Sequence, residues 1–391
     1  MIASASHASH ASHAARAPAA LLGLLGPLGL LGLLAAAPAV AGAQQAPAEL
    51  ATADSAPAPR VRLFALPVVG YTPETKLAGG LALVRLVRPP VGDRATRPSS
   101  SSASLIYTQR GQLTAALTGE RWTTANRWRL AGGARYARFP YQLFGVGANA
   151  ADSAEEEYTS RRWGADVELR RRVAGALYLG TLAEFERTML LRVEEGGLLD
   201  RGVLAGSAGG NIALLGATAT WDTRDNVYAA ASGVYVQLAA GLADGAFGSD
   251  FDYDRTALDA RTYVSAGRVG VLAFQGVATR VGGRAPFERL AQIGGNSVMR
   301  GYLQGRYRDL AAAAAQAEYR TPIWRRLGAV AFVGVGDVAP TLGDLDLATL
   351  KSVVGAGLRY ALSREDRLNI RLDYGGGGGA GGTYVTLGEA F

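Results

Sequence analysis

The stretch "DRLNIRLDY", residues 366–374, shows the pattern that decides the fold. Polar residues occupy its odd-numbered positions from 367 to 373, and apolar residues occupy its even-numbered positions from 368 to 374. Successive side chains of a β-strand point to opposite sides, so this stretch predicts a strand with one polar and one apolar face. Residues 163–170 and 313–320 alternate in the same way. About sixteen such segments follow one another, separated by turns rich in Gly, Asp and Pro.

Alternating strands occur both in soluble sandwiches and in membrane barrels, and three features favour a barrel. There are more strands than an ordinary sandwich holds, an export signal precedes them, and long and short connections alternate. The long connections are expected near 135–157, 188–208, 281–304 and 337–349, and the short ones near 171–174, 267–270 and 362–366. The stretch 88–100 breaks this alternation, because it is a long connection at the end of the barrel where short connections are expected.

We therefore predict an all-β fold, a transmembrane antiparallel β-barrel of about 16 strands over residues 61–391. A sheet can cross a bilayer only when it closes on itself, because every backbone polar group needs a partner there. An arginine that faces lipid near the midplane costs roughly 2–4 kcal/mol. The many arginines in the strands are accordingly expected to face a polar lumen.

The N-terminus is predicted to be a signal peptide, residues 1–43, followed by a Pro/Ala-rich periplasmic linker, residues 44–60. Arg16 supplies the positive charge, residues 21–36 the apolar stretch, and Ala41-Gly42-Ala43 the cleavage site. A transmembrane anchor is the alternative, but the apolar stretch is short and Pro27 interrupts it. All three histidines lie in this segment and are expected to be removed with it: His7, His10 and His13.

Composition excludes several functions. Cysteine is absent, and the net charge of +7 comes almost wholly from scattered arginines, so no nucleic-acid partner is expected. No histidine is expected after signal removal, and no Gly-x-Ser-x-Gly elbow or phosphate-binding Gly-Lys-Ser/Thr loop occurs. We therefore expect no enzymatic activity, catalytic residue, cofactor or metal. Glu184 and Glu186 are interpreted as partners in lumen salt bridges.

One segment resembles a known family. Residues 293–309, "IGGNSVMRGYLQGRYRD", are similar to the loop-six motif of the BamA/TamA-type outer-membrane assembly barrels, the bacterial surface antigen superfamily. The motif is a Gly-Gly pair followed by Arg300-Gly301-Tyr302. Other resemblances follow in the family's order and span residues 61–391: "PVVGYTPETK" at 67–76, "DTRDN" at 222–226 with Gly233, "EYRTP" at 318–322, "IRLDYG" at 370–375 and "GEAF" at 388–391.

The resemblance implies that loop six folds into the lumen and that acidic groups hold Arg300 there. Glu318 is its expected partner, but Gly334 stands where the family has a second acid. Asp337 is one residue out of phase, so Asp373 is the favoured replacement. The alternative is that Arg300 is one of many hydrated lumen arginines. The family's turn between strands eight and nine corresponds to Asp222, Arg224, Asp225 and Gly233.

The resemblance also makes Gly388 and Phe391 the ending that the assembly machinery reads, with Phe391 closing the last strand. Relatives carry POTRA domains before the barrel. The interval between Gln44 and Val61 has no room for one, so the chain looks like a short form. The glycine-rich run 375–382 is interpreted as a flexible outer loop that lets the last strand move.

The expected function is a non-enzymatic barrel that inserts, translocates or scaffolds proteins or lipids at the bacterial outer membrane. Its implied partners are outer-membrane lipid and client outer-membrane or secreted proteins. A weak seam between the first and last strands would open and accept a strand of the client. Two alternatives remain open: a passive pore for small polar solutes, and a structural homodimer joined through strand edges.

Overall fold

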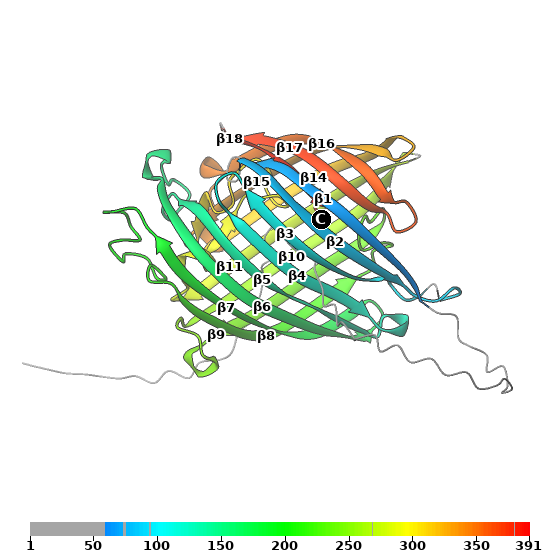
Figure 1. The fold of residues 1–391 in the computed structure, drawn as a ribbon, viewed down its shortest axis with the longest axis horizontal. Coiled ribbons are helices and arrows are strands. Elements are labelled where there is room, and N and C mark those ends of the chain that lie inside the picture. The colour runs from blue at the N-terminus through cyan, green and yellow to red at the C-terminus, as the bar shows by residue number, and fades with distance from the viewer. Residues whose placement is uncertain (1–58, 73–75, 94, 268, 379) are drawn as a thin grey trace, which may run out of the picture.

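The computed structural model describes residues 59–72, 76–93, 95–267, 269–378 and 380–391. They form one antiparallel sheet of 16 strands that curls into a barrel (Figure 1), together with a separate two-stranded sheet. This confirms the predicted fold class and strand number. The predicted signal peptide and nearly all of the linker lie outside the described residues, and their boundaries stay predictions. The first strand begins at Arg60.

Each strand of the main sheet pairs with its neighbour in the chain, except that β11 pairs with β14. The main sheet consists of β1 Arg60–Thr72, β2 Lys76–Arg88, β3 Ser99–Thr108, β4 Leu113–Trp122, β5 Trp128–Leu143, β6 Glu156–Ala174, β7 Leu177–Arg192, β8 Gly210–Asp222, β9 Gly233–Ala243, β10 Tyr253–Ala266, β11 Gly270–Gly283, β14 Ala311–Trp324, β15 Leu327–Ala339, β16 Lys351–Ser363, β17 Leu368–Gly377 and β18 Ala380–Leu387. The small sheet consists of β12 Ala291–Ile293 and β13 Tyr307–Asp309.

Short 3-10 helices occur in the connections: η1 Thr124–Asn126, η2 Asp152–Ala154, η3 Gly245–Phe247, η4 Phe287–Arg289, η5 Leu342–Asp344 and η6 Leu347–Thr349. Among the described residues, no helix has the length and apolar character that crossing a membrane requires.

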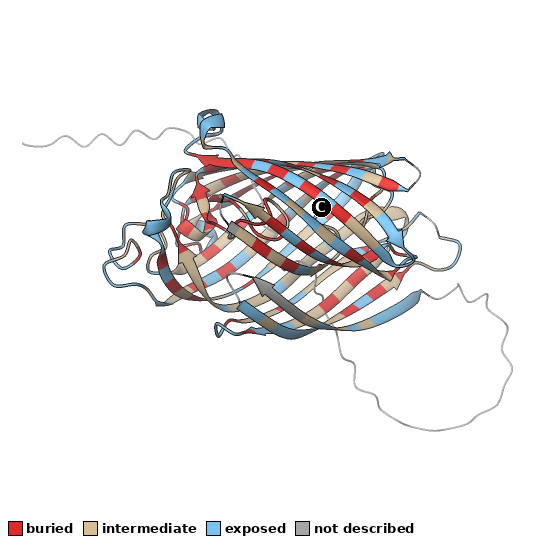
Figure 2. Cartoon of the chain, turned by 90° about the horizontal axis from the view of Figure 1, so that it is seen from above, coloured by how far each residue is buried: buried red, intermediate tan, exposed pale blue. Residues whose placement is uncertain are grey.

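Buried and exposed residues alternate along the strands (Figure 2), as the sequence pattern predicts. On β6 the outward residues Trp163 and Val167 are 45% and 47% exposed. On the inner face Arg129 bonds to Glu120 on one neighbouring strand at 2.6 Å and to Glu168 on the other at 2.8 Å. Apolar side chains therefore cover the outside, and paired charges line the lumen.

The four longest connections of the main sheet lie at one end of the barrel, although that end also has a short one, 109–112, and the opposite end has longer ones at 89–98 and 223–232. The long connections are residues 144–155, 193–209, 284–310 and 340–350, and we call their end the loop end. The chain enters β1 at the other end, which we call the turn end. Two connections there contain only two residues, 175–176 and 325–326. Both sets agree with the predicted alternation, although the strands extend further into the loops than expected.

The seam lies between β1 and β18, which run side by side (Figure 1). In the described part of the chain, every other neighbouring pair of the main sheet forms a hydrogen-bonded ladder, but these two strands form none. Strand β18 has 8 residues and β1 has 13, so β18 is too short to lie beside the whole of β1 at the seam. Within the described ranges, the seam is the one place where this sheet keeps open edges.

Two predictions about the C-terminal region are wrong. The glycine-rich run 375–382 is not a loop, because β17 includes Gly375–Gly377 and β18 begins at Ala380. Phe391 does not close the last strand, because β18 ends at Leu387. Gly388 then adopts a φ of 82°, which favours glycine, and the chain leaves the sheet.

Candidate functional site: loop six, the seam strand and the turn end

Loop six is the connection 284–310 between β11 and β14, and Arg300 is its most enclosed charge. Its side chain has 0% exposure and donates hydrogen bonds to Glu318 of β14 and Asp373 of β17. The guanidinium also lies 3.6 Å from the centre of the Phe332 ring. Two carboxylates and an aromatic face thus surround one cation on the inner wall.

Further hydrogen bonds tie loop six to the last strands of the barrel. The backbone N–H of Gly301 donates to the Tyr384 hydroxyl of β18 at 3.1 Å. The Tyr302 hydroxyl donates to the carbonyl of Ser352 on β16 at 3.1 Å. Arg371 of β17 donates to the carbonyl of Asn296 at 2.7 Å. Loop six is therefore bonded directly to the seam strand.

The glycine-rich run provides the surface on which loop six lies. A Cβ added at Gly375 would stand 2.1 Å from the backbone oxygen of Arg300. One added at Gly301, whose φ is 125°, would stand 2.8 Å from the backbone of Gly375. Only glycine permits so close a contact between two backbones. These glycines therefore permit packing, where we had expected mobility.

Strand β15, on which the resemblance places a second acidic residue, provides no acidic partner for Arg300. Gly334 has no side chain, and Asp337 bonds to Lys351 at 2.9 Å instead. Asp337 is 2% exposed, and Thr349 of the connection 340–350 also donates to it, so it is held near the loop end and not at Arg300.

Several charged residues of this site were given no role by the sequence interpretation. Arg320 donates to Glu318 at 2.8 Å, and Arg359 donates to Glu389 at 2.6 Å and also to Asp373. Arg320 and Arg359 have the same inward phase as Glu318 and Asp373, and that signal was available. Glu389 follows the last strand, so no strand phase could have placed it.

The tail 388–391 turns inward from β18. The N–H of Gly388 donates to the carbonyl of Asn369 at 2.7 Å. Phe391 is 6% exposed and packs with Tyr263 and Ala273, and Arg320 donates to its backbone oxygen at 3.0 Å. Arg320 thus bonds both to the tail, at Phe391, and to Glu318, the partner of Arg300. It links the end of the chain to loop six.

A second group of charges lies at the turn end, around Asp222 at the end of β8. Asp222 accepts hydrogen bonds from Arg97 at 2.5 Å and from Arg224 at 3.0 Å. Arg97 belongs to the connection 89–98, which we could not explain from the sequence. The connection joins β2 to β3, and Arg97 reaches from it to the end of β8.

The turn after β8 also reaches the turn between β16 and β17, six strands away in the sheet. Arg367 donates to Asp225, and the Asn226 side chain donates to the carbonyl of Asp366 at 3.1 Å. Gly233 has a φ of 102°, and a Cβ there would stand 2.4 Å from the carbonyl of Thr223. The motif 222–233 therefore folds across this end of the lumen.

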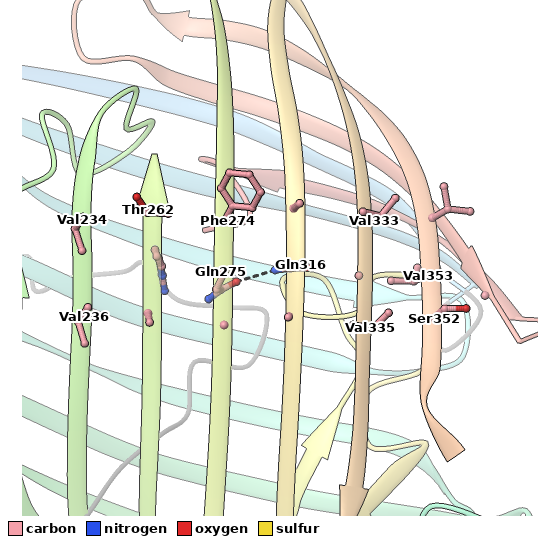
Figure 3. Close-up of a pocket in the computed structure, with 18 of the residues that line it drawn as sticks. Val234, Val236, Thr262, Phe274, Gln275, Gln316, Val333, Val335, Ser352 and Val353 are labelled. Carbon is pink, nitrogen blue, oxygen red and sulfur yellow. Dashed lines mark hydrogen bonds between the residues drawn. The ribbon is translucent and has the colours of Figure 1, made fainter. Parts of the chain in front are cut away.

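A hollow of about 800 Å³ lies along the wall from β9 to β17 (Figure 3). Most of its lining is apolar or small, and Gln275 and Gln316 form a hydrogen bond of 2.7 Å across two strands (Figure 3). Gln316 also donates to the carbonyl of Ser297 in loop six at 2.7 Å. Loop six thus has a further uncharged attachment to the wall, in addition to those of Gly301 and Tyr302. In the described residues no group of side chains suits a metal ion.

The chain belongs to the Omp85 superfamily, because the Omp85 superfamily domain matches residues 97–379. Comparison with curated protein sequences gives no match. The fold is similar to that of BamA from Haemophilus ducreyi lacking POTRA domains 1–3, with a TM-score of 0.55 and 15% identity over 84% of this chain and 70% of that one. It is also similar to CdiB from Acinetobacter baumannii, with a TM-score of 0.53 and 13% identity over 84% of this chain. The match spans 59% of the CdiB chain.

Proposed function

We propose that this barrel resides in the bacterial outer membrane and inserts or translocates client proteins at its seam, without enzymatic activity. The observation that carries the proposal is the pair of open edges at β1 and β18. An open edge presents N–H and C=O groups that a bilayer cannot satisfy, so it favours pairing with another strand. Membership of the Omp85 superfamily supports the same activity.

Loop six would control access to this edge. It bonds to the seam strand through Gly301 and Tyr384 and to the neighbouring strand through Arg300 and Asp373. A client strand that displaces β18 must either break these contacts or move loop six together with β18. The clamp role of Arg300, Glu318 and Asp373 is part of the proposal, and so is the role of Gly388 and Phe391 as an assembly signal.

The experiment uses the absence of cysteine in the chain. Paired cysteines are introduced between residues 61–64 of β1 and residues 384–387 of β18, and a control pair joins Ala219 of β8 to Leu238 of β9, which face each other in a ladder. Each protein is placed in liposomes, and folding of a second, unfolded barrel is followed with and without oxidation. Single-channel conductance is recorded in parallel.

We expect the unlocked protein and the oxidised control to accelerate folding, and the oxidised seam variant to lose the acceleration. Steady conductance without any acceleration would instead support the passive pore. Acceleration that survives the seam disulfide would overturn the seam as the working edge.

A further inference from the structure

Three arginines face outward together near the loop end of β5, β6 and β7. Arg138 and Arg161 stand directly opposite each other in the ladder. Arg187 is diagonal to Arg161, because its direct partner is Trp163, two residues further along β6. Trp163 is 45% exposed on the outer face, and Arg161 shares its phase. We call Arg138, Arg161 and Arg187 the arginine triad.

The triad lies at one boundary of the apolar band. At the turn end, Trp128 and Arg171 form a ladder pair, and the Arg171 guanidinium lies 5.5 Å from the Trp128 ring. Arg138 and Arg161 form the ladder pair ten residues further along the same two strands. The outward residues between the two pairs are all apolar or aromatic: Leu130, Gly132, Ala134, Tyr136, Trp163, Ala165, Val167 and Leu169. A tilted strand crosses the hydrocarbon core in roughly 9–11 residues, so the triad lies at headgroup level.

The triad has no counter-ion among the described residues. Like charges placed directly opposite each other on one face destabilise a sheet, and Arg138 and Arg161 are such a pair. The buried Nε of Arg161 has no hydrogen-bond partner in the described structure, and Arg187 has only the side-chain oxygen of Asn211, at 3.3 Å. Arg280, another outward arginine near the loop end, is instead neutralised by Asp254 at 2.6 Å. The arrangement of the triad therefore calls for an anion from outside the chain.

We propose that the arginine triad binds the phosphate of a lipid headgroup in the leaflet at the loop end. Guanidinium groups match phosphate oxygens through paired, charge-assisted hydrogen bonds. Tyr136 and Trp163, below the triad on the same face, would pack against the upper part of the acyl chains. The site is on the outer face of β5 to β7, opposite the inner face of β6 and β7 that Glu288 and Arg289 of loop six contact, and away from the seam. It rests on the proposed outer-membrane placement but not on client insertion.

The test measures lipid retention by the whole purified protein in detergent, using native mass spectrometry. The probes are bis-phosphorylated lipid A, the same glycolipid without phosphates, and inorganic phosphate as a competitor. The variant is Arg138→Gln/Arg161→Gln/Arg187→Gln, and Arg280→Gln is the matched control. A second variant with all three changed to Lys keeps the charge and tests rescue.

We expect the wild type to retain lipid A about tenfold better than the dephosphorylated lipid, and the Gln variant to lose this preference. Arg280→Gln should behave as the wild type, and the Lys variant should recover part of the preference. Equal retention of both lipids by the wild type, or an unchanged preference in the Gln variant, would overturn the proposal. Full displacement by millimolar inorganic phosphate would also overturn it, because the ligand would then be free phosphate. If the Gln variant fails to fold, Arg161→Gln alone must still lower the preference.

Discussion

Loop six, which enters the lumen from the loop end, and the motif 222–233 at the turn end are held in different ways. Loop six is held by Arg300, which has no exposure and two equally enclosed carboxylates. At the turn end, Asp222 is nearly buried with two arginines, but the contact of Asp225 with Arg367 leaves both side chains partly exposed, at 29% and 47%. Breaking a buried ion pair costs several kcal/mol, whereas an exposed pair contributes about 0–1 kcal/mol. The difference indicates that loop six is fixed in place, and that the turn end is the easier of the two to open.

The largest effect should come from Arg300→Ala. It removes the cation between Glu318 and Asp373. Arg320 still bonds to Glu318 and Arg359 to Asp373, so the cost should lie below the roughly 3–5 kcal/mol of leaving a buried charge without any partner. We expect loop six to become sensitive to protease and the barrel to unfold at a lower temperature, as seen by gel shift after heating. Arg280→Ala is the control, because its pair is exposed. Unchanged protease sensitivity would mean that Arg300 does not hold the loop.

Gly375→Ala tests the same clamp from the other side. The new methyl group would meet the Arg300 backbone oxygen at 2.1 Å, and overpacking of this kind costs about 1–3 kcal/mol. We expect the backbone of loop six to move away from β17, although Arg300, Glu318 and Asp373 are all still present in this variant. Gly79→Ala is the matched control, because a Cβ there meets nothing within 4 Å. Distances between spin labels on loop six and β17 would report the movement. Identical distances in wild type and variant would show that the backbone contact is dispensable.

These two predictions also show what the sequence could determine. Strand phase was sufficient to put Glu318 and Asp373 on the inner wall, because a period of two fixes the face of every residue. It could not show that the glycine run packs under loop six, since glycine is equally compatible with mobility and with close contact. Nor could it place the tail, because Glu389 and Phe391 follow the last strand, and their positions depend on Arg359, Arg320 and Tyr263 from distant strands.

A smaller effect is expected from Asp222→Asn at the turn end. The change removes the charge that Arg97 and Arg224 share, and hydrogen bonds to charged groups contribute about 1.5–3 kcal/mol. The connection 89–98 should loosen, and ions should enter the lumen from this end more often. Single-channel recording should show brief openings more often than in the wild type, with loop six still protected from protease. Exposure of loop six as well would mean that the two ends are coupled.

The smallest effect should be the pH response of the contact between Asp225 and Arg367. Burial works against the charged carboxylate, but hydrogen bonds from the Ala231 backbone and from Arg367 hold the pKa of Asp225 below its ordinary value of 3.8. A lowered pKa means that the contact contributes its full stability above pH 3.8 and loses it only as the pH falls through the lower folded-state value. Openings at the turn end should therefore be independent of pH from 7 down to 5 and increase only in stronger acid. Asp225→Asn is the control variant. It removes the titrating group, so the openings of this variant should already be more frequent at pH 7.

Subtracting the acid response of this variant from that of the wild type removes the contribution of the other carboxylates, Asp222 among them. A wild type whose openings increase between pH 7 and 5 would place the controlling group elsewhere. Because the pair is partly exposed, raising the salt concentration at pH 7 should reproduce part of the effect of Asp225→Asn, while the enclosed Arg300 pairs should be little affected by the same salt.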